Sequence, residues 1–228
     1  MRHNLLPVVL SLIAGSADVI SFLGLGGLFA AHITGNLVIL AAHIVTGQAA
    51  SVALLLSVPT FMLALGLTRL LAAGLERGGR SSLASLLLLQ FLLLAGFFVL
   101  CVLAGPRADP KAAIAIAAGM LGVSALAVQN ALVQISLADV PSTAVVTTNL
   151  TRLTMDLGDI LLGRDSAEVA IARRRAQHTW PVVLGFAAGA ALGAWCFANI
   201  GLWSLALPAA LALLALLLSL RPVSARAA

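Results

Sequence analysis

The chain contains 228 residues, of which 61% are hydrophobic and 9% charged, and its formal net charge is +5. A soluble domain of this length needs more polar surface than this composition supplies, so a mainly aqueous location is excluded. The basic residues are arginines except for Lys111, and they lie in short segments between apolar blocks. That placement is typical of membrane-orientation signals and not of nucleic-acid binding.

Six apolar blocks are long enough to cross a bilayer as helices, because about 20 residues at 1.5 Å each span a hydrocarbon core of roughly 30 Å. They cover residues 5–23, 50–73, 83–103, 112–132, 180–199 and 202–220. The alternating ten-residue segments of a membrane β-barrel are not found in the sequence. The first block also has features of a secretory signal, with Arg2, an apolar run and small residues at 14–17. Because the apolar run continues past Asp18 to Leu23, a first membrane span is favoured.

Small and sulfur-containing residues inside these blocks favour helix packing. The fifth block carries Gly185, Gly189 and Gly193, a spacing that permits close helix contact in membranes. Chance in a Gly/Ala-rich helix is the alternative. Cys101 and Cys196 both fall in apolar blocks, where ordinary packing is favoured over a disulfide or a metal site.

Two weaker segments, residues 24–47 and 136–163, interrupt the series of blocks. Each has an irregular or extended first part and a short helix-like second part. A Thr/Asn cluster stands between the two parts, and such residues before an apolar run are typical of helix N-caps. The clusters are Thr34, Gly35 and Asn36 in the first segment and Thr147, Thr148 and Asn149 in the second. We therefore expect a short or discontinuous helix in each segment.

The two short segments match each other as copies of one unit. At a constant offset, Thr34, Asn36, Leu37 and His43 correspond to Thr147, Asn149, Leu150 and Asp156. After a one-residue slip, Asp18 in the first block corresponds to Asn130. Each short segment follows one long block and precedes two. The sequence therefore predicts a single all-α membrane domain, 1–228, built from an internal two-fold repeat with halves 1–108 and 109–228.

The basic residues also predict an orientation. The segment 164–178 contains three consecutive arginines, and Arg2, Arg221 and Arg226 lie near the ends, so the positive-inside rule places this segment and both termini in the cytoplasm. If neither short segment crosses, the chain has six spans and inverted halves. If both cross, it has eight spans and parallel halves, and the loops 74–81 and 105–111 exchange sides. The inverted arrangement is preferred because many transporters contain inverted repeats with broken helices.

Polar residues at membrane depth are the candidate functional groups. Asp18 lies inside the first block, where a carboxylate costs at least ~2.5 kcal/mol, so it is expected to face a cavity or a partner. Its functional interpretation is a proton, cation or solute contact, and its structural one is a bond to a neighbouring hydroxyl or to the start of a short helix. Asn130 would supply a neutral polar group at the matching place.

The two Thr/Asn clusters are the main candidates for substrate binding. A helix N-terminus presents unpaired N–H groups and a positive dipole end, so two such ends at mid-depth would attract a polar or anionic solute. Plain N-capping without a ligand is the alternative. Either way these segments should be buried in protein or beside water, since irregular backbone is not tolerated against lipid.

Several further polar residues carry weaker hypotheses. Arg152 and Asp156, spaced i and i+4, would form an ion pair or a gate, or else belong to the solvated face of an interfacial helix. His43 is a candidate proton relay, although a structural hydrogen bond is favoured for it and for His32. Gln90, Gln129 and Gln134 are expected to hydrogen-bond between helices.

No pattern for an enzyme, a cofactor or a metal site is found in the sequence. Nucleotide-binding loops, dinucleotide fingerprints, HExxH and clustered His/Cys ligands are all missing, so we expect no enzyme activity, no cofactor and no bound metal. A membrane enzyme using Asp18 and Asp156 as an acid pair is the third-ranked alternative.

A set of short motifs extends over both halves of the chain: Gly15-Ser16-Ala17-Asp18, Phe22-Leu23-Gly24, Phe29 and Thr34-Gly35-Asn36, with Gln129-Asn130-Ala131 and Thr147-Thr148-Asn149-Leu150-Thr151 in the second half. In these motifs the sequence resembles the YoaK-like family of uncharacterised bacterial membrane proteins. The resemblance covers nearly the whole chain and implies a protein of the bacterial plasma membrane with no established substrate. At Thr148 a glycine is expected by analogy with the first half, so close backbone approach there is in doubt.

These patterns together predict a secondary transporter or channel for a small polar or anionic solute. The expected partners are the lipid bilayer and the solute, without nucleic acid, and a homo-oligomer is left open. The alternative is a non-transporting membrane protein with a structural, assembly or sensing role. The sequence does not identify the substrate, the coupling ion or the direction of transport.

Overall fold

The computed structural model describes residues 5–48, 51–105, 109–138, 140–163 and 165–220. Arg2, Arg107, Arg164, Arg221 and Arg226, which entered the orientation prediction, lie outside these residues. Within the described ranges every regular element is helical. The elements are α1 (Leu5–Gly24), α2 (Ile33–Val45), α3 (Val52–Arg77), α4 (Ser82–Ala104), α5 (Ala113–Ser136), α6 (Val146–Leu162), α7 (Ser166–Ile200), the short 3-10 helix η2 (Gly201–Leu205) and α8 (Ala206–Leu220).

Five stretches are long and apolar enough to cross a membrane. They are α1, α3, α4, α5 and the stretch Ser166–Leu220, which contains α7, η2 and α8. The prediction of an all-α chain with bilayer-length helices is confirmed. The shorter α2 is apolar but has only 13 residues, about 20 Å at 1.5 Å per residue, which is less than the hydrocarbon thickness.

The fifth predicted block begins too late. The apolar block predicted from sequence starts at residue 180, with the basic segment 164–178 before it, whereas α7 already begins at Ser166. The Asp165 side chain caps the helix by accepting a hydrogen bond from the backbone N–H of Ala167, and Glu168 lies in the first turn. Both features stabilise a helix start, and the Ala and Arg residues that follow are strong helix formers.

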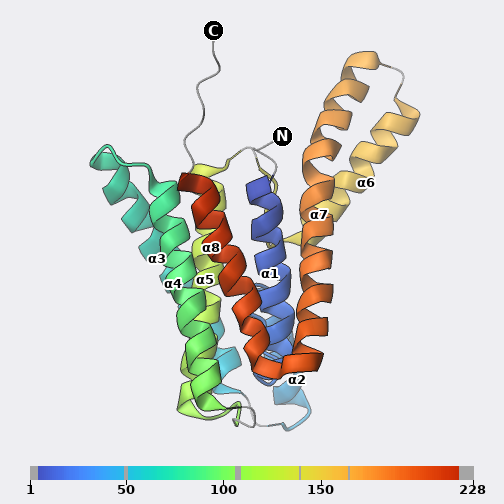
Figure 1. Ribbon diagram of the computed structural model, residues 1–228. Helices are drawn as coiled ribbons and strands as arrows, with labels where there is room; N and C mark the ends of the chain where they lie inside the picture. The colour runs from blue at the N-terminus through green and yellow to red at the C-terminus, as the bar shows by residue number, and fades with distance from the viewer. Residues whose placement is uncertain (1–4, 49–50, 106–108, 139, 164, 221–228) are drawn as a thin grey trace.

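The long helices run along one axis and the two short ones lie at opposite ends (Figure 1). α2 lies at the lower end of the bundle, where α1 ends and α3 begins, and α6 lies beside the upper part of α7. α1 packs against α7 and α8, whereas α5 packs against α3 and α4. α4 also packs against α8, α2 lies on α3, and α6 lies on α7.

Glycines bring α1 and α7 into backbone contact, as the sequence predicted. Gly189 faces Leu12, where an added Cβ would lie 2.8 Å from the Leu12 Cα, and Gly193 faces Ser16 in the same way at 2.9 Å. From the other helix, a Cβ on Gly15 would collide with the backbone carbonyl of Phe186. The helix axes are therefore closer than side chains would allow, which is the geometry of small-residue interfaces in membranes.

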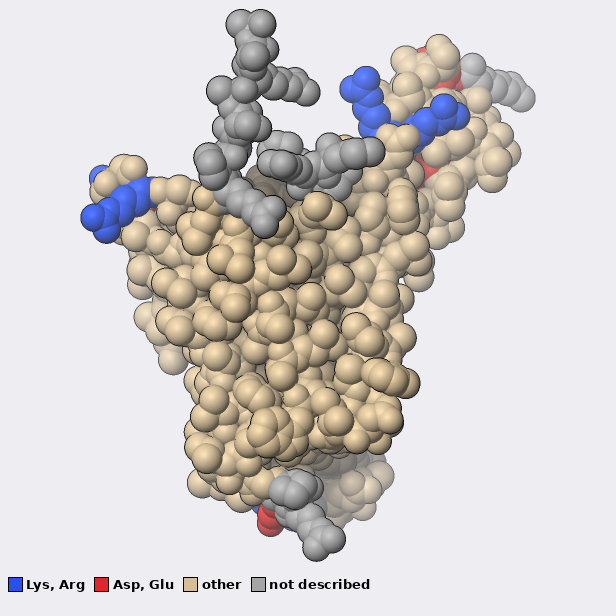
Figure 2. Space-filling view, in the orientation of Figure 1, with Lys and Arg blue, Asp and Glu red and all other residues tan. Residues whose placement is uncertain are grey.

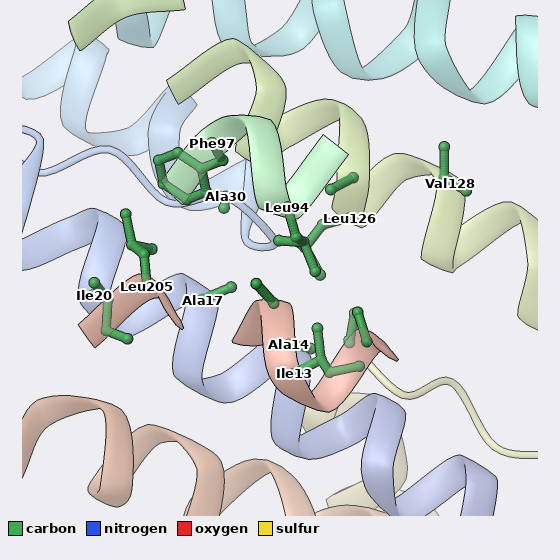
Figure 3. Close-up of a cluster of buried hydrophobic side chains, with 14 of the residues drawn as sticks. Ile13, Ala14, Ala17, Ile20, Ala30, Leu94, Phe97, Leu126, Val128 and Leu205 are labelled. Carbon is green, nitrogen blue, oxygen red and sulfur yellow. The ribbon is translucent and has the colours of Figure 1, made fainter. Parts of the chain in front are cut away.

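The centre of the bundle is filled by aliphatic and aromatic side chains from several helices. Figure 3 shows Leu205 of η2 next to Ile20 and Ala17 of α1, while Phe97 of α4 and Ile13 of α1 lie at other places in the same cluster. Each of these five residues is at most 1% exposed. They come from elements far apart in sequence, so this core fixes the relative positions of α1, α4 and η2.

The outer surface of the bundle is apolar between two charged ends. On α3, Leu55, Met62, Leu63 and Leu70 are each 59–70% exposed. Figure 2 shows Lys and Arg gathered at the upper end, over the α3–α4 turn and the α6–α7 hairpin, while the middle of the visible face carries no charged side chain. A large exposed apolar belt is unfavourable in water and is the surface expected against lipid.

Candidate functional site

The chain turns back along α1 after that helix ends. Gly26 and Gly27 have φ values of +65° and +84°, a left-handed conformation that glycine adopts without strain. The backbone N–H groups of Ala31 and His32 then donate to Oδ1 of Asp18, at 2.7 and 3.3 Å. Asp18 lies six residues before the end of α1, so the start of α2 has returned roughly 9 Å along α1.

Asp18 and His32 form a pair at this point. The Asp18 side chain is 6% exposed, and its Oδ2 lies 2.5 Å from Nδ1 of His32. One carboxylate oxygen therefore holds the backbone before α2 and the other holds the imidazole. His32 also lines the cavity described next. His32 was expected to have a structural role and was not among the predicted site residues.

A cavity of about 570 Å³ opens beside this pair, between α1, the returning segment, α2 and α7. Its walls include Phe22, Phe29 and Phe186, and the rings of Phe22 and Phe29 are stacked with centroids 4.6 Å apart. The His32 ring meets the Phe186 ring edge-on at 5.5 Å. We call this cavity, with the Asp18–His32 pair at its polar end, the aromatic pocket.

The residues of the first Thr/Asn cluster have two different roles: two line the pocket, and the third holds the backbone beside it. Thr34 and Gly35 line the aromatic pocket. Asn36 is fully buried and clamps the returning segment: its Oδ1 accepts from the backbone N–H of Phe29 at 2.8 Å and its Nδ2 donates to the carbonyl of Phe29 at 2.9 Å. The cluster does not cap the helix as predicted, because the N-cap of α2 is His32, whose side chain makes no capping hydrogen bond.

The second short segment is held by a related contact. The Nδ2 of buried Asn149 donates to the carbonyl of Ser142 at 2.6 Å, again seven residues earlier in the chain. Thr147 and Thr148 are exposed on α6. The N-cap of α6 is Val145, which makes no side-chain capping bond, so the N-cap prediction is wrong here as well. The structure does not bring the two Thr/Asn clusters together in one pocket: the aromatic pocket is lined by the first alone.

Gln129, and not Asn130, reaches the second segment. The Nε2 of Gln129 donates to Thr143 Oγ1 and to the carbonyl of Leu10, both at 2.9 Å, and its Oε1 accepts from Gln90 at 2.7 Å. Asn130 instead donates to the carbonyl of Leu126 in its own helix. The prediction that Gln129 and Gln90 hydrogen-bond between helices is therefore confirmed, and the one-residue slip that matched Asn130 to Asp18 does not describe the contacts.

The predicted pair of Arg152 and Asp156 is replaced by another one. Asp156 is 3% exposed and accepts from Arg175 of α7, at 2.8 Å from Nε and 2.7 Å from a terminal nitrogen. The second carboxylate of α6, Asp159, lies 3.6 Å from the same guanidinium. Arg152 is exposed one turn before Asp156. The i and i+4 spacing did not indicate Arg175, which is brought in by the α6–α7 hairpin.

The remaining candidates lie outside the aromatic pocket. His43 is partly buried near the end of α2, and its Nδ1 has no hydrogen-bond partner among the described residues. Asp18 and Asp156 have different partners and line different cavities. In the part of the chain that the structure describes, no three His, Cys, Asp or Glu side chains gather at metal-binding distance. Cys101 and Cys196 are both free thiols.

The comparisons with known proteins place the chain in a family. The model of the family described as "Protein of unknown function (DUF1275)" matches residues 6–218, so the chain belongs to the DUF1275 family. The match covers nearly the whole chain, which is consistent with the resemblance to uncharacterised membrane proteins found in the sequence. Comparison with curated proteins and with solved structures gave no match.

Proposed function

We propose, starting from a family without an assigned function, that this DUF1275 member is a secondary carrier or channel. In this proposal it moves a small solute across the bacterial plasma membrane. The observation that supports this proposal is the aromatic pocket, a cavity of about 570 Å³ with a buried carboxylate–imidazole pair at its polar end. Ionisable groups at membrane depth are costly and mark solute or proton pathways by default.

The pocket supports a more specific solute class than the sequence did. Three phenylalanine rings favour a solute with an apolar or aromatic body. The Asp18 carboxylate already occupies the start of α2, so an anion there would meet like charge at close range. We therefore favour a neutral or weakly basic solute that hydrogen-bonds to His32 over the anionic solute considered from sequence. Transfer of a proton to the pair would provide the coupling.

An inverted two-fold repeat is part of the proposal. When α1 to α4 are matched in order with α5 to α8, helix contacts correspond in pairs. The contact of α1 with α7 corresponds to that of α5 with α3, α1 with α8 to α5 with α4, and α2 with α3 to α6 with α7. Both short helices also begin at equivalent positions, Ile33 and Val146, at the offset found in the sequence. Asn36 and Asn149 each bond to the residue seven positions earlier. These regularities support repeats 1–108 and 109–228 and broken helices of the transporter type.

The same arrangement favours six spans with a basic cytoplasmic end. α2 and α6 lie at opposite ends of the bundle and neither runs its full length (Figure 1). The α3–α4 turn and the α6–α7 hairpin, which carry the arginines, lie at the same end (Figure 2). The positive-inside rule assigns that end to the cytoplasm.

Flux through purified protein in liposomes tests the proposal. The protein would be screened with pools of aromatic amines, neutral aromatic compounds and small anions, together with a pH-sensitive dye inside the liposomes. Asp18→Asn retains an oxygen for the backbone N–H groups but removes the charge that holds His32. Loss of a hydrogen bond to a charged group costs about 1.5–3 kcal/mol, so we expect transport of the active pool to fall about tenfold or more.

Asp109→Asn is the matched control, because Asp109 is an exposed carboxylate in the segment before α5 and its side chain bonds only locally, to the N–H of Lys111. It should leave transport unchanged. If no pool is transported, or if folded Asp18→Asn and His32→Gln variants transport as well as the wild type, the carrier proposal is wrong. Asp18 would then be a structural group, as expected for a membrane assembly protein.

A further inference from the structure

A second cavity lies where α6 meets α7, at the basic end of the molecule (Figure 2). It has a volume of about 510 Å³ and shares no lining residue with the aromatic pocket. Its basic lining residues are Arg152 from α6 and Arg174, Arg175 and His178 from α7. We call it the basic pocket. The proposed transport function makes no use of it.

Among the described residues, the basic pocket carries more positive than negative charge. Asp156, the acidic residue in its lining, is buried and accepts both hydrogen bonds of the Arg175 fork. This contact fixes the Arg175 guanidinium and offsets one charge. Among the described residues, Arg152 and Arg174 form no salt bridge. Arg175 is offset by Asp156 and by Asp159, which lies 3.6 Å from the same guanidinium, so three guanidinium groups against these two carboxylates leave a charge of +1 with His178 neutral. The two arginines without a carboxylate, Arg152 and Arg174, favour an anion with several acceptor oxygens.

The position of the basic pocket corresponds to the lipid headgroup layer. Thr179 lines the pocket, and the apolar part of α7 begins at the next residue, Trp180, which is 49% exposed. Half-exposed tryptophans at the end of a span concentrate at the membrane–water interface. The pocket is therefore at the depth where phospholipid phosphates lie and not in the hydrocarbon core.

The exposed side chains on the outer face of α6 are also consistent with a basic pocket at the level of the lipid headgroups. Leu150, Leu157 and Leu161 are 49–82% exposed, and their spacing of seven and four residues places them on one face of the helix. Arg152 and Asp156 lie on the opposite face, toward α7. Because α6 runs beside α7 (Figure 1), this apolar face is directed away from α7, where acyl chains would meet it. The apolar side chain of Met155 in the pocket lining would meet the upper part of a lipid chain.

We propose that the basic pocket binds the phosphate group of an anionic phospholipid. Arg152 and Arg174 supply guanidinium groups for the phosphate oxygens, and Asp156 positions Arg175 as the third one. Basic pockets between helices on the cytoplasmic side are a recognised type of headgroup site. A neutral zwitterionic phospholipid lacks the net charge to offset the arginines, so it should bind more weakly.

The experiment is a lipid titration of the purified full-length protein in neutral detergent, with the thermal midpoint Tm as the signal. Dioctanoyl phosphatidylglycerol is the probe, with dioctanoyl phosphatidylcholine and inorganic phosphate titrated separately. A ligand that binds the folded state raises Tm with concentration, which gives an apparent Kd. We expect phosphatidylglycerol to raise Tm at concentrations where the other two have little effect.

The variants are Arg152→Gln, Arg174→Gln and their combination, with Arg173→Gln as the matched control. Arg173 is the neighbour of Arg174, loses the same charge and does not line the pocket. One arginine near anionic lipid contributes a factor of about fivefold in affinity, so the double variant should raise the apparent Kd about 30-fold. Arg152 and Arg174 are exposed, so Tm without lipid should stay unchanged.

Three results would overturn the proposal. The first is a double variant that binds phosphatidylglycerol as tightly as the wild type. The second is an equal loss with Arg173→Gln, which would indicate diffuse attraction to the whole basic end. The third is an equal Tm rise with inorganic phosphate, which would show that the pocket holds free phosphate and does not select a lipid.

Discussion

At the scale of single residues, buried amides hold the irregular backbone beside the aromatic pocket. Asn36 makes two hydrogen bonds to the main chain of Phe29, whose ring is part of the pocket wall. Its side chain thus joins α2 to the segment that returns along α1. A carboxylate or an aliphatic residue of similar size could not both donate and accept here.

Asn36→Ala should therefore destabilise the protein. It leaves the N–H and the carbonyl of Phe29 without partners, and each unsatisfied buried group costs roughly 1–3 kcal/mol. Asn130→Ala is the control, since Asn130 bonds only to the carbonyl of Leu126 in its own helix, and it should cost less than about 1 kcal/mol. Thermal unfolding in detergent measures both. Equal Tm values for the two variants would contradict the clamp.

Residue-level prediction from sequence succeeded where burial alone identifies a residue. A carboxylate in an apolar block must have a partner, and Asp18 has one. The identity of that partner, His32, depends on two left-handed glycines that reverse the chain. The hydrophobic periodicity of the sequence does not indicate this reversal. Thr34 and Gly35 are predicted from sequence as substrate-binding residues at a helix start. They line the pocket from the first turn of α2, because α2 begins one residue earlier than the cluster.

At the scale of helices, the length of each apolar block predicted that a helix exists there more reliably than it predicted where the helix begins and ends. α1 to α5 end within a few residues of the predicted limits, because glycine, proline and charged residues mark those ends. α7 is much longer than its apolar block, since hydropathy does not register the Ala/Arg-rich part that precedes the block. The result is a 35-residue helix with a charged first part and an apolar second part.

The α1–α7 interface gives a sharp prediction at this scale. In Gly189→Ala the new methyl group would meet the Leu12 backbone, with its Cα at 2.8 Å, so the helices must separate at a cost of about 1–3 kcal/mol. Gly66→Ala on α3 is the control, because no atom lies within 4 Å of an added Cβ there. It should be neutral or stabilise by up to about 1 kcal/mol. An unchanged Tm for Gly189→Ala would show that the helices are not in backbone contact.

At the scale of the whole molecule, the proposed six-span topology is open to a direct test. In a background with Cys101→Ala and Cys196→Ala, a single cysteine would replace Ser81 or Lys111, both exposed and at opposite ends of the bundle. A membrane-impermeant maleimide added to intact cells should label the Lys111→Cys protein and not the Ser81→Cys protein. Labelling of Ser81→Cys from outside would contradict the inverted arrangement and favour eight spans.

The way the two halves of the chain pack together could not be predicted from the sequence. The three-residue match between the short segments indicated two related units but could not show how they meet. The contact of α4 with α8 and the common core of Ile13, Phe97 and Leu205 are long-range packing. Such contacts follow from shape and volume in three dimensions, and one sequence does not encode them as a pattern.

Pro181 in α7 has a consequence for both cavities. A proline inside a helix has no N–H to donate, so the carbonyl of Gln177 loses its usual partner and the helix can bend there. Arg174 of the basic pocket lies on one side of this joint and Phe186 of the aromatic pocket on the other. The α6–α7 hairpin can therefore differ in angle from the lower part of α7, where Gly185, Gly189 and Gly193 contact α1.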